Sequence, residues 1–204
     1  IRLPGDFSLK NALAAASLAH ALNIPTDSIK RALEKIDRIP GRAERIEEGQ
    51  TFGVIVDYAH TPDSLQALYD AYKNMRKICV LGNTGGGRDT WKRPVMGKIA
   101  DENCAEIILT NEDPYDEDPR AIVEAMTAGM SAGGGSASGG QRPKLQIIMD
   151  RREAISRALE IALSWSSLES LGTTLSPSNG SKGIQPLDKA RGDQNGVAVL
   201  ITGK

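Results

Sequence analysis

The sequence predicts an α/β protein with a doubly wound, mostly parallel sheet, preceded by a short two-helix segment. Five apolar runs rich in β-branched residues are continuous rather than alternating, as in strands that are buried on both faces. Stretches with helical spacing and cap signals separate these runs. This alternation of strand and helix is typical of doubly wound domains with right-handed crossovers. The predicted strands lie at 52–57, 77–81, 106–110, 145–149 and 197–202.

The first 39 residues show only helical patterns. Apolar residues keep helical spacing over 9–19 and 29–36, and the segment 23–27, Asn-Ile-Pro-Thr-Asp, combines a stop signal with a start signal. The connector at 39–42, Ile-Pro-Gly-Arg, has the composition of a domain boundary. We therefore expect two helices in 1–39 and the α/β domain in 40–204.

Cap signals define the helices between the strands. A helix is expected over 94–103, and three others are each introduced by a capping residue followed by proline or by a capping box. Two stretches rich in Gly and Ser, at 131–142 and 164–196, predict flexible insertions. The cap pairs are Thr61 with Pro62, Asp118 with Pro119, and Asp150 with Glu153.

Composition excludes several classes of function. The 204 residues include 25 basic and 26 acidic side chains, a net charge of −1. A nucleic-acid partner is therefore not expected, because phosphate binding needs a basic surplus. No apolar run approaches a membrane span, and the N-terminus has no signal-peptide pattern and looks cut from a longer chain. We expect a cytoplasmic protein without a membrane partner, in which Cys79 and Cys104 are buried thiols rather than a disulfide or a zinc site.

The unusual residues follow the predicted strands. Polar or glycine-rich segments occur at 57–62, 82–89, 111–118 and 203–204, each directly after an apolar run. In an open α/β sheet, ligands bind beyond the carboxyl ends of the strands. We therefore expect these four segments to share one rim.

Residue types suggest more than one use for each segment. Asp57 at a strand end can accept hydrogen bonds from a ribose diol, although Asp57 and His60 as an isolated pair are more typical of a turn. The glycines at 85–87 suit an anion, but they match neither the P-loop nor the GxGxxG spacing. Arg88, Lys92 and Arg93 could bind a carboxylate or phosphate, or form a solvated turn.

The third segment is acidic. Glu112 and Asp113, nearest the strand end, are the candidates for holding an ammonium group. A calcium site is an alternative, but the spacing does not follow an EF-hand loop.

Four motifs in this order resemble the Mur ligase family. They are PGR at 40–42, DYAHTP at 57–62, GGRDxxKRPxMG at 86–97 and TGK at 202–204. The resemblance is strongest to the UDP-N-acetylmuramoyl-tripeptide synthetase (MurE type) branch, and residues 5–15 are similar to the end of that family's central domain. The resemblance implies that 40–204 is the family's Rossmann-like C-terminal domain and that 1–39 are the last helices of the central domain.

The family activity that the resemblance implies is an ATP-dependent amide ligation through an acyl phosphate. A diamino acid would be added as the third residue to UDP-N-acetylmuramoyl-L-alanyl-D-glutamate in peptidoglycan synthesis. The implied cofactors are ATP and Mg²⁺, with magnesium held mainly by a central domain that this chain largely lacks. The implied partners include that domain and the N-terminal domain of the same enzyme, so this chain alone is expected to be inactive.

The resemblance also implies roles for individual residues. Arg42, Asp57 and His60 would contact the nucleotide, Arg88 would bind the carboxylate of the incoming amino acid, and Gly203 would begin a stretch that borders the same pocket. It assigns no catalytic residue and no metal ligand to this chain.

One segment departs from the family pattern. Synthetases for meso-diaminopimelate carry DNPR, whose arginine pairs with the distal carboxylate. Here Glu112, Asp113, Pro114 and Tyr115 occupy those positions. A distal carboxylate would meet repulsion and a distal ammonium would be favoured, so we predict a lysine- or ornithine-like acceptor. The alternatives are another Mur or folylpolyglutamate-type ligase, or a non-catalytic nucleotide-binding module.

Overall fold

One six-stranded sheet organises the protein. The computed structural model describes residues 1–87, 89–130, 144–170 and 196–203. The strand order is β1-β2-β6-β3-β4-β5, and all neighbouring pairs are parallel except β1 with β2. The five predicted strands are confirmed, and the two-residue β1 is an addition. The strands are β1 (Glu44–Arg45), β2 (Gly53–Asp57), β3 (Met75–Leu81), β4 (Glu106–Leu109), β5 (Lys144–Ile147) and β6 (Gly196–Thr202).

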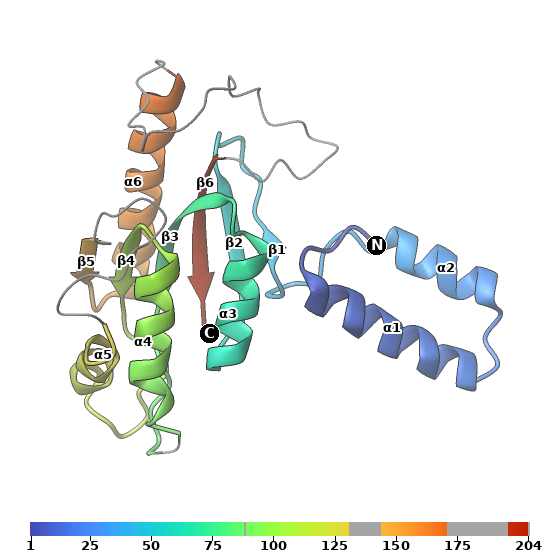
Figure 1. The fold of residues 1–204 in the computed structure, drawn as a ribbon, viewed down its shortest axis with the longest axis horizontal. Coiled ribbons are helices and arrows are strands. Elements are labelled where there is room, and N and C mark those ends of the chain that lie inside the picture. The colour runs from blue at the N-terminus through green and yellow to red at the C-terminus, as the bar shows by residue number, and fades with distance from the viewer. Residues whose placement is uncertain (88, 131–143, 171–195, 204) are drawn as a thin grey trace.

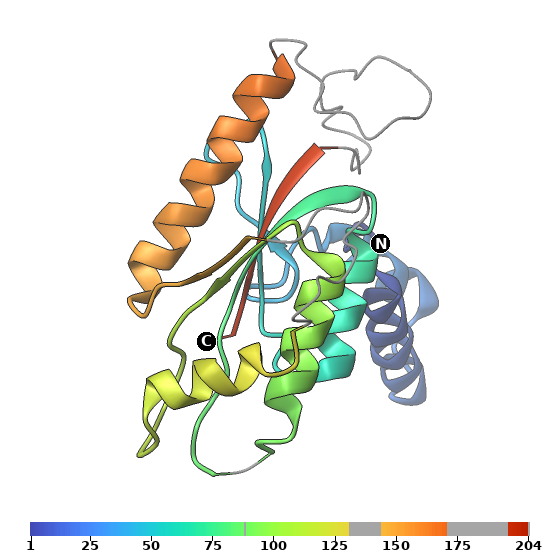
Figure 2. The same cartoon turned by 60° about the vertical axis from the view of Figure 1, so that its left-hand side comes forward.

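Helices cover both faces of this sheet, as Figure 2 shows. One face carries α3 (Pro62–Ala71), α4 (Lys92–Asn103) and α5 (Pro119–Thr127), and the other carries α6 (Arg151–Ser170). The doubly wound α/β prediction is therefore confirmed.

Two apolar cores explain why the strands read as continuous apolar runs. Along β3, Cys79 and Leu81 join the core beneath α3, α4 and α5, whereas Ile78 and Val80 join the core beneath α6. All four side chains are fully buried. With both faces of the strand buried, no polar alternation remains.

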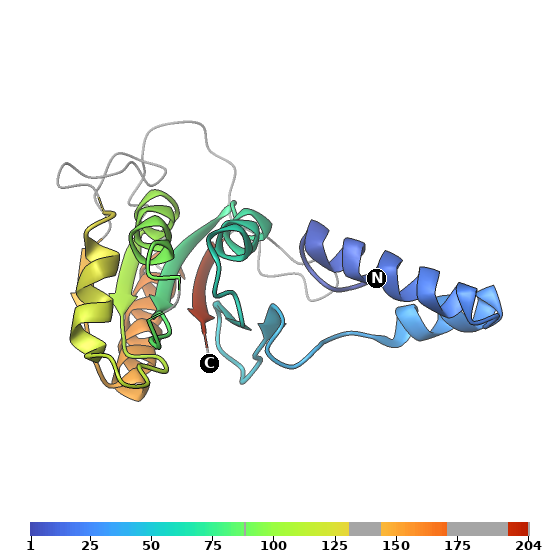
Figure 3. The ribbon, with the colours of Figure 1, turned by 90° about the horizontal axis from the view of Figure 1, so that it is seen from below.

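The N-terminal helices form a hairpin that projects from the sheet (Figures 1 and 3). They are α1 (Asp6–Ala21) and α2 (Thr26–Lys35), as predicted. Phe7 packs against the core shared by α3 and α4, but α1 leaves its leucines in solvent. The leucines at 9, 13 and 18 in α1, and Leu22 directly after it, are between 62 and 75% exposed.

The predicted caps fix where the loops end. The Ser64 N–H donates to Thr61 Oγ1 at 3.3 Å, and the Thr61 N–H donates to Ser64 Oγ at 3.1 Å. Asp118 Oδ1 accepts the backbone N–H of Arg120 at 3.0 Å. Asp150 Oδ1 accepts that of Glu153 at 2.9 Å. These bonds satisfy N–H groups that have no partner inside the helix.

The second predicted insertion does not begin at residue 164. Residues 164–170 continue α6, where the Arg76 guanidinium lies 3.4 Å from the centroid of the Trp165 ring. This contact ties the last turns of α6 to β3, so the predicted boundary at 164 was wrong. The remainder, 171–195, and the other predicted insertion, 131–142, lie outside the described residues.

The expectation of two free thiols was also wrong. Cys79 and Cys104 form a disulfide with Cα atoms 6.1 Å apart, and both residues are fully buried. Cys79 lies in β3 and Cys104 directly follows α4, so the β3–α4–β4 connection returns the chain beside β3. A separation of 25 residues conceals that contact in the sequence. Within the described residues, none of the helices combines the length and apolar character needed to cross a bilayer.

Candidate functional site

The four chemically unusual segments meet at the carboxyl edge of the sheet. Because β6 lies between β2 and β3, Asp57 is in register with Thr202, and Ile201 with Val80. Thr110 follows β4 and donates its N–H to the Leu81 carbonyl at 3.0 Å. The predicted single rim is therefore confirmed, and it lies where the β6 arrow ends in Figure 1.

Arg42, Asp57 and His60 lie together on one side of this rim. The Arg42 guanidinium is 4.8 Å from the centroid of the Tyr58 ring, a cation–π distance. The Tyr58 and His60 rings are 4.7 Å apart between centroids, and His60 Nδ1 is 2.9 Å from the Tyr58 carbonyl oxygen. Arg42 and His60 are exposed, so both face solvent beside one aromatic ring.

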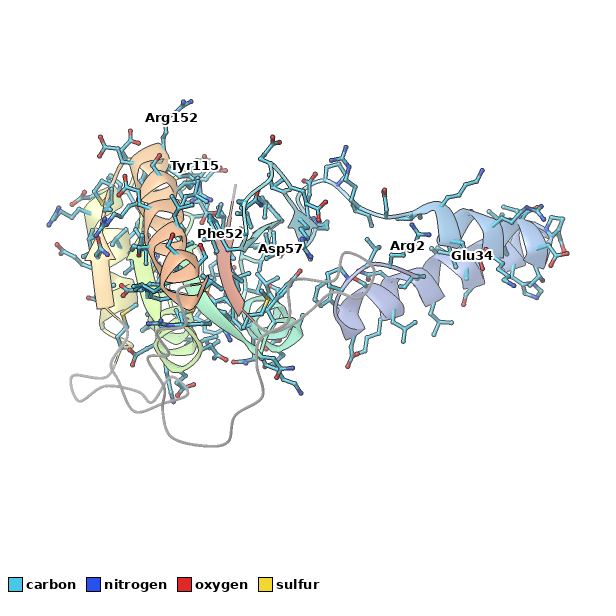
Figure 4. All side chains as sticks on the ribbon, turned by 90° about the horizontal axis from the view of Figure 1, so that it is seen from above. Arg2, Glu34, Phe52, Asp57, Tyr115 and Arg152 are labelled. Atoms are coloured by element: carbon cyan, nitrogen blue, oxygen red, sulfur yellow. A yellow bond between two sulfur atoms is a disulfide. The ribbon has the colours of Figure 1, made fainter. Side chains whose placement is uncertain are left out.

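Asp57 is the buried member of this group. Its Oδ2 accepts the Ala43 N–H at 2.6 Å, which fixes the connector to the end of β2. Burial raises the pKa of the Asp57 carboxyl, and hydrogen bonds from the backbone of Ala43 and Ala59 and the charge of Arg42 oppose the rise. Asp57 thus has the structural role that the turn interpretation predicts, because its carboxylate holds the connector by a hydrogen bond. Figure 4 shows Asp57 on the side of the sheet that faces the hairpin, and Tyr115 farther from the hairpin.

A pocket of about 350 Å³ opens next to His60. It lies between the starts of α3 and α4, and Trp91 on its wall is 64% exposed. Sequence analysis missed Trp91, although a tryptophan between a glycine loop and a helix is itself a candidate binding residue. The lining residues are His60, Thr61, Pro62, Asp63, Asp89, Trp91 and Lys92.

On the other side of the rim, the glycine loop (82–87) and the acidic loop (111–118) are joined. The Gly85 N–H donates to the Asp113 carbonyl at 2.8 Å, and the Gly87 N–H donates to Glu117 Oε1 at 2.6 Å. Arg93 Nη1 lies 2.9 Å from Glu117 Oε2, and Arg93 Nη2 donates to Oε1 at 3.0 Å. The two loops therefore form one unit.

This pairing changes the interpretation of the basic residues after the glycines. The sequence suggests Arg93 as one of the residues that bind an anion, but Arg93 is buried and its charge is matched by Glu117. Lys92 lines the pocket instead. Arg88 lies outside the described residues. Sequence analysis missed the Arg93–Glu117 pair because its members are 24 positions apart.

Glu112 and Gly203 meet where the glycine and acidic loops approach β6. The Glu112 carboxylate is buried, and Thr84 Oγ1 donates to its Oε1 at 3.3 Å. A methyl group on Gly203 would collide with that carboxylate. The Gly203 N–H donates to the Asp57 carbonyl at 3.2 Å, which links this group to the Arg42 side of the rim.

Arg151, at the start of α6, completes this region. Its Nη2 donates to the Thr202 carbonyl at 2.8 Å, so it holds the last residue of β6. Burial lowers the pKa of Arg151, and the charge of Glu112 opposes that effect. Sequence analysis did not single out Arg151, although its position two residues after a predicted strand was an available signal.

The remaining predicted site residues lie on the acidic loop. Asp113 contributes its carbonyl to the glycine loop, and Tyr115 is 70% exposed with its ring over Gly86. The structure thus brings Arg42, Asp57 and His60 into one group, and Glu112 and Gly203 into contact. Within the residues that the structure describes, no three His, Cys, Asp or Glu side chains are grouped to hold a metal ion.

Fold and rim together define a doubly wound α/β domain whose sheet edge has a cation-bearing side and a carboxylate-bearing side. The chain belongs to the Mur ligase family: residues 41–165 match the family model described as the Mur ligase, glutamate ligase domain.

Known proteins agree with this assignment. The chain is 40% identical over 163 residues to UDP-N-acetylmuramoyl-L-alanyl-D-glutamate–2,6-diaminopimelate ligase of Oceanobacillus iheyensis, covering 79% of this chain and 31% of that protein. It is 44% identical over 137 residues to UDP-N-acetylmuramyl-tripeptide synthetase of a Roseiflexus species, covering 66% and 27%. The chain thus spans less than a third of the length of these two curated relatives.

A solved structure extends the similarity to the hairpin. The structure of a UDP-N-acetylmuramoyl-L-alanyl-D-glutamate–2,6-diaminopimelate ligase superposes with a TM-score of 0.54 at 27% identity. It covers 99% of this chain and 34% of the solved one. The α1–α2 hairpin and the α/β unit are therefore both within the matched region.

Proposed function

We propose that this chain is part of an ATP-dependent carbon–nitrogen ligase that adds a diamino acid to UDP-N-acetylmuramoyl-L-alanyl-D-glutamate. The observation that carries the proposal is the hydrogen bond from the Gly203 N–H to the Asp57 carbonyl. It joins a side of the rim suited to a nucleotide to a side suited to an amino acid. A ligase that joins an activated carboxylate to an amine needs both in proximity.

The nucleotide side is built from Arg42, Tyr58 and His60. An exposed guanidinium held over an aromatic ring is oriented without being neutralised, so it remains available to phosphate oxygens. His60 borders the adjoining pocket, whose Lys92 adds a second cation. ATP, when bound, supplies the phosphoryl group that activates the carboxylate of UDP-N-acetylmuramoyl-L-alanyl-D-glutamate. Asp57 shapes this side by holding the connector.

The amino-acid side is built from the acidic loop. Glu112 is held by Thr84 beside Gly203, and Asp113 and Tyr115 follow on the same loop. A carboxylate-rich loop suits the ammonium groups of a diamino acid. Tyr115 offers no charge to a distal carboxylate, so we propose lysine or ornithine as the acceptor. The two relatives named above as diaminopimelate ligases make that compound the competing acceptor.

The helical hairpin belongs, in this proposal, to a neighbouring domain of the same enzyme. Its exposed leucines on α1 favour burial against further chain. That domain would hold most of the magnesium site, and the acyl phosphate would form there. Residues 40–204 would then be the domain that closes over ATP and receives the amino acid. A chain limited to these 204 residues is expected to be inactive.

The test is phosphate release from ATP by the complete ligase that contains this chain. UDP-N-acetylmuramoyl-L-alanyl-D-glutamate is supplied with lysine, ornithine or diaminopimelate in turn, and a reaction without amino acid is the control. Release that depends on lysine or ornithine supports both parts of the proposal. Release that depends on diaminopimelate keeps the ligase and overturns the acceptor. No release with any of the three, from folded protein, overturns the ligase in favour of another substrate or a non-catalytic module.

A further inference from the structure

The Glu117 carboxylate binds both the glycine loop, at Gly87, and helix α4, at Arg93. These two residues precede Glu117 by 30 and 24 positions. One carboxylate oxygen accepts both the Gly87 N–H, at 2.6 Å, and Arg93 Nη2, at 3.0 Å. The other oxygen lies 2.9 Å from Arg93 Nη1. This is a bidentate pair with an added backbone donor, a geometry that fixes orientation as well as distance.

Arg93 gives this arrangement a rigid base. It lies in the first turn of α4, and its side chain is only 6% exposed. A buried guanidinium is costly without a partner, so Glu117 and Arg93 depend on each other. Arg93 Nη2 also reaches the Thr84 carbonyl at 3.4 Å, so Arg93 contacts the glycine loop directly at Thr84 and through Glu117 at Gly87.

The two loops fit closely along this line. The Gly85 N–H donates to the Asp113 carbonyl at 2.8 Å, and any side chain on Gly85 would collide with the Pro114 carbonyl. A Cβ on Gly86 would lie 3.6 Å from the Tyr115 ring. Glu117 makes the last of these contacts between the loops, by accepting the Gly87 N–H. A shift of the acidic loop would therefore move Glu112, Asp113 and Tyr115 together.

We propose that Glu117 is a positioning residue for the acceptor amino-acid site, acting through Arg93 and Gly87. It sets the separation of the glycine and acidic loops, and so places Asp113 and Tyr115 relative to the end of the glycine loop. The inference rests on the proposed function for the identity of the ligand. The contact between the loops is tested independently of that function.

The first experiment measures amide hydrogen exchange in the complete ligase that contains this chain. Glu117→Gln removes one oxygen and the charge, whereas Glu124→Gln is the matched control because its exposed pair with Arg120 is a simple i,i+4 contact. We expect exchange at Gly85 and Gly87 to rise by about tenfold or more in Glu117→Gln, with no change in Glu124→Gln. Glu117→Asp keeps the charge and should show a smaller rise. Unchanged exchange in Glu117→Gln overturns the contact.

The second experiment measures steady-state kinetics of the complete ligase. We expect Glu117→Gln to raise KM for the amino acid by about tenfold or more while KM for ATP changes less than about twofold. Glu117→Asp should recover part of the loss, and Glu124→Gln should match the parent. A purely structural defect would instead lower kcat or raise both KM values together, and that result overturns the positioning role.

The two experiments separate the possible failures. Faster exchange with an unchanged KM for the amino acid keeps the contact and overturns its role in binding. A parent ligase that releases no phosphate with any acceptor overturns the proposed function, and the assignment of Glu117 to an amino-acid site fails with it. The exchange result then decides only whether the contact exists.

Discussion

The buried carboxylate of Glu112 lies directly against the α-carbon of Gly203, in the space that a side chain at position 203 would occupy. Gly203 has φ +94°, a conformation that side chains disfavour. Thr84 holds the carboxylate from the opposite loop. Residues 91 positions apart in the sequence are thus fitted to each other at the rim.

Gly203→Ala tests this fit. The added methyl must displace the Glu112 carboxylate, so we expect kcat/KM for the amino acid in the complete ligase to fall by about tenfold or more. Gly49→Ala is the control, because Gly49 also has a positive φ, +86°, but a Cβ there would meet nothing within 4 Å. Equal losses in the two variants would attribute the effect to backbone strain alone.

The proposed preference for lysine or ornithine depends on Tyr115. Tyr115→Arg restores a guanidinium at the position where the family's diaminopimelate enzymes carry one. We expect the ratio of kcat/KM values for diaminopimelate over lysine to rise by about tenfold or more. Tyr115→Phe should leave that ratio unchanged, because it removes only the hydroxyl. A parent enzyme that already prefers diaminopimelate contradicts the prediction.

The Glu117–Arg93 pair should contribute to acid sensitivity. Hydrogen bonds from Arg93 and from the Gly87 backbone hold the pKa of Glu117 below its ordinary value of 4.5. A depressed carboxyl pKa stabilises the fold above the unfolded pKa, and that stability is lost as pH falls through the folded value. Urea unfolding at pH 7 and at successively lower pH should show a smaller acid loss for Glu117→Gln than for the parent. Glu124→Gln should follow the parent, and identical curves for all three proteins would contradict the pair's contribution.

The Cys79–Cys104 disulfide predicts a thiol count of zero. Protein prepared without reductant and unfolded in urea should show no free thiol until a reductant is added, when two appear. Replacing Cys104 by Ala should lower the free energy of unfolding by about 2–4 kcal/mol under oxidising conditions. Under reducing conditions the parent should lose most of this advantage. Two reactive thiols in unreduced, unfolded protein would exclude the bond.

Local signals in the sequence predicted the elements, because each depends on neighbouring residues. Thr61 and Asp118 cap their helices from within three positions, and the strands are apolar on both faces wherever helices cover both faces. The place of β6 between β2 and β3 has no such local signal. It depends on which strands pair, and that is decided by the complete set of crossovers.

The candidate site likewise combines residues that local sequence signals predicted with residues that they did not. Asp57, Glu112 and Gly203 follow apolar runs, so the rule that ligands bind beyond strand ends found them. Arg93 and Glu117 are ordinary charged residues at ordinary helix and loop positions, and only the folded chain brings them together. Arg151 reaches Thr202 across 51 residues. Such contacts between distant residues could not be read from residue type or spacing.

The central place of β6 also bears on how the protein is made. In the described sheet β2 and β3 pair with β6 and not with each other. The middle of the sheet therefore cannot form until residues 196–202 have been synthesised. During synthesis, β2 and β3 emerge long before the strand that joins them. Until then their apolar faces and unpaired edges are open to other chains. The nascent protein therefore has an interval in which chaperone binding competes with aggregation, and that interval ends when β6 has been synthesised and pairs with β2 and β3.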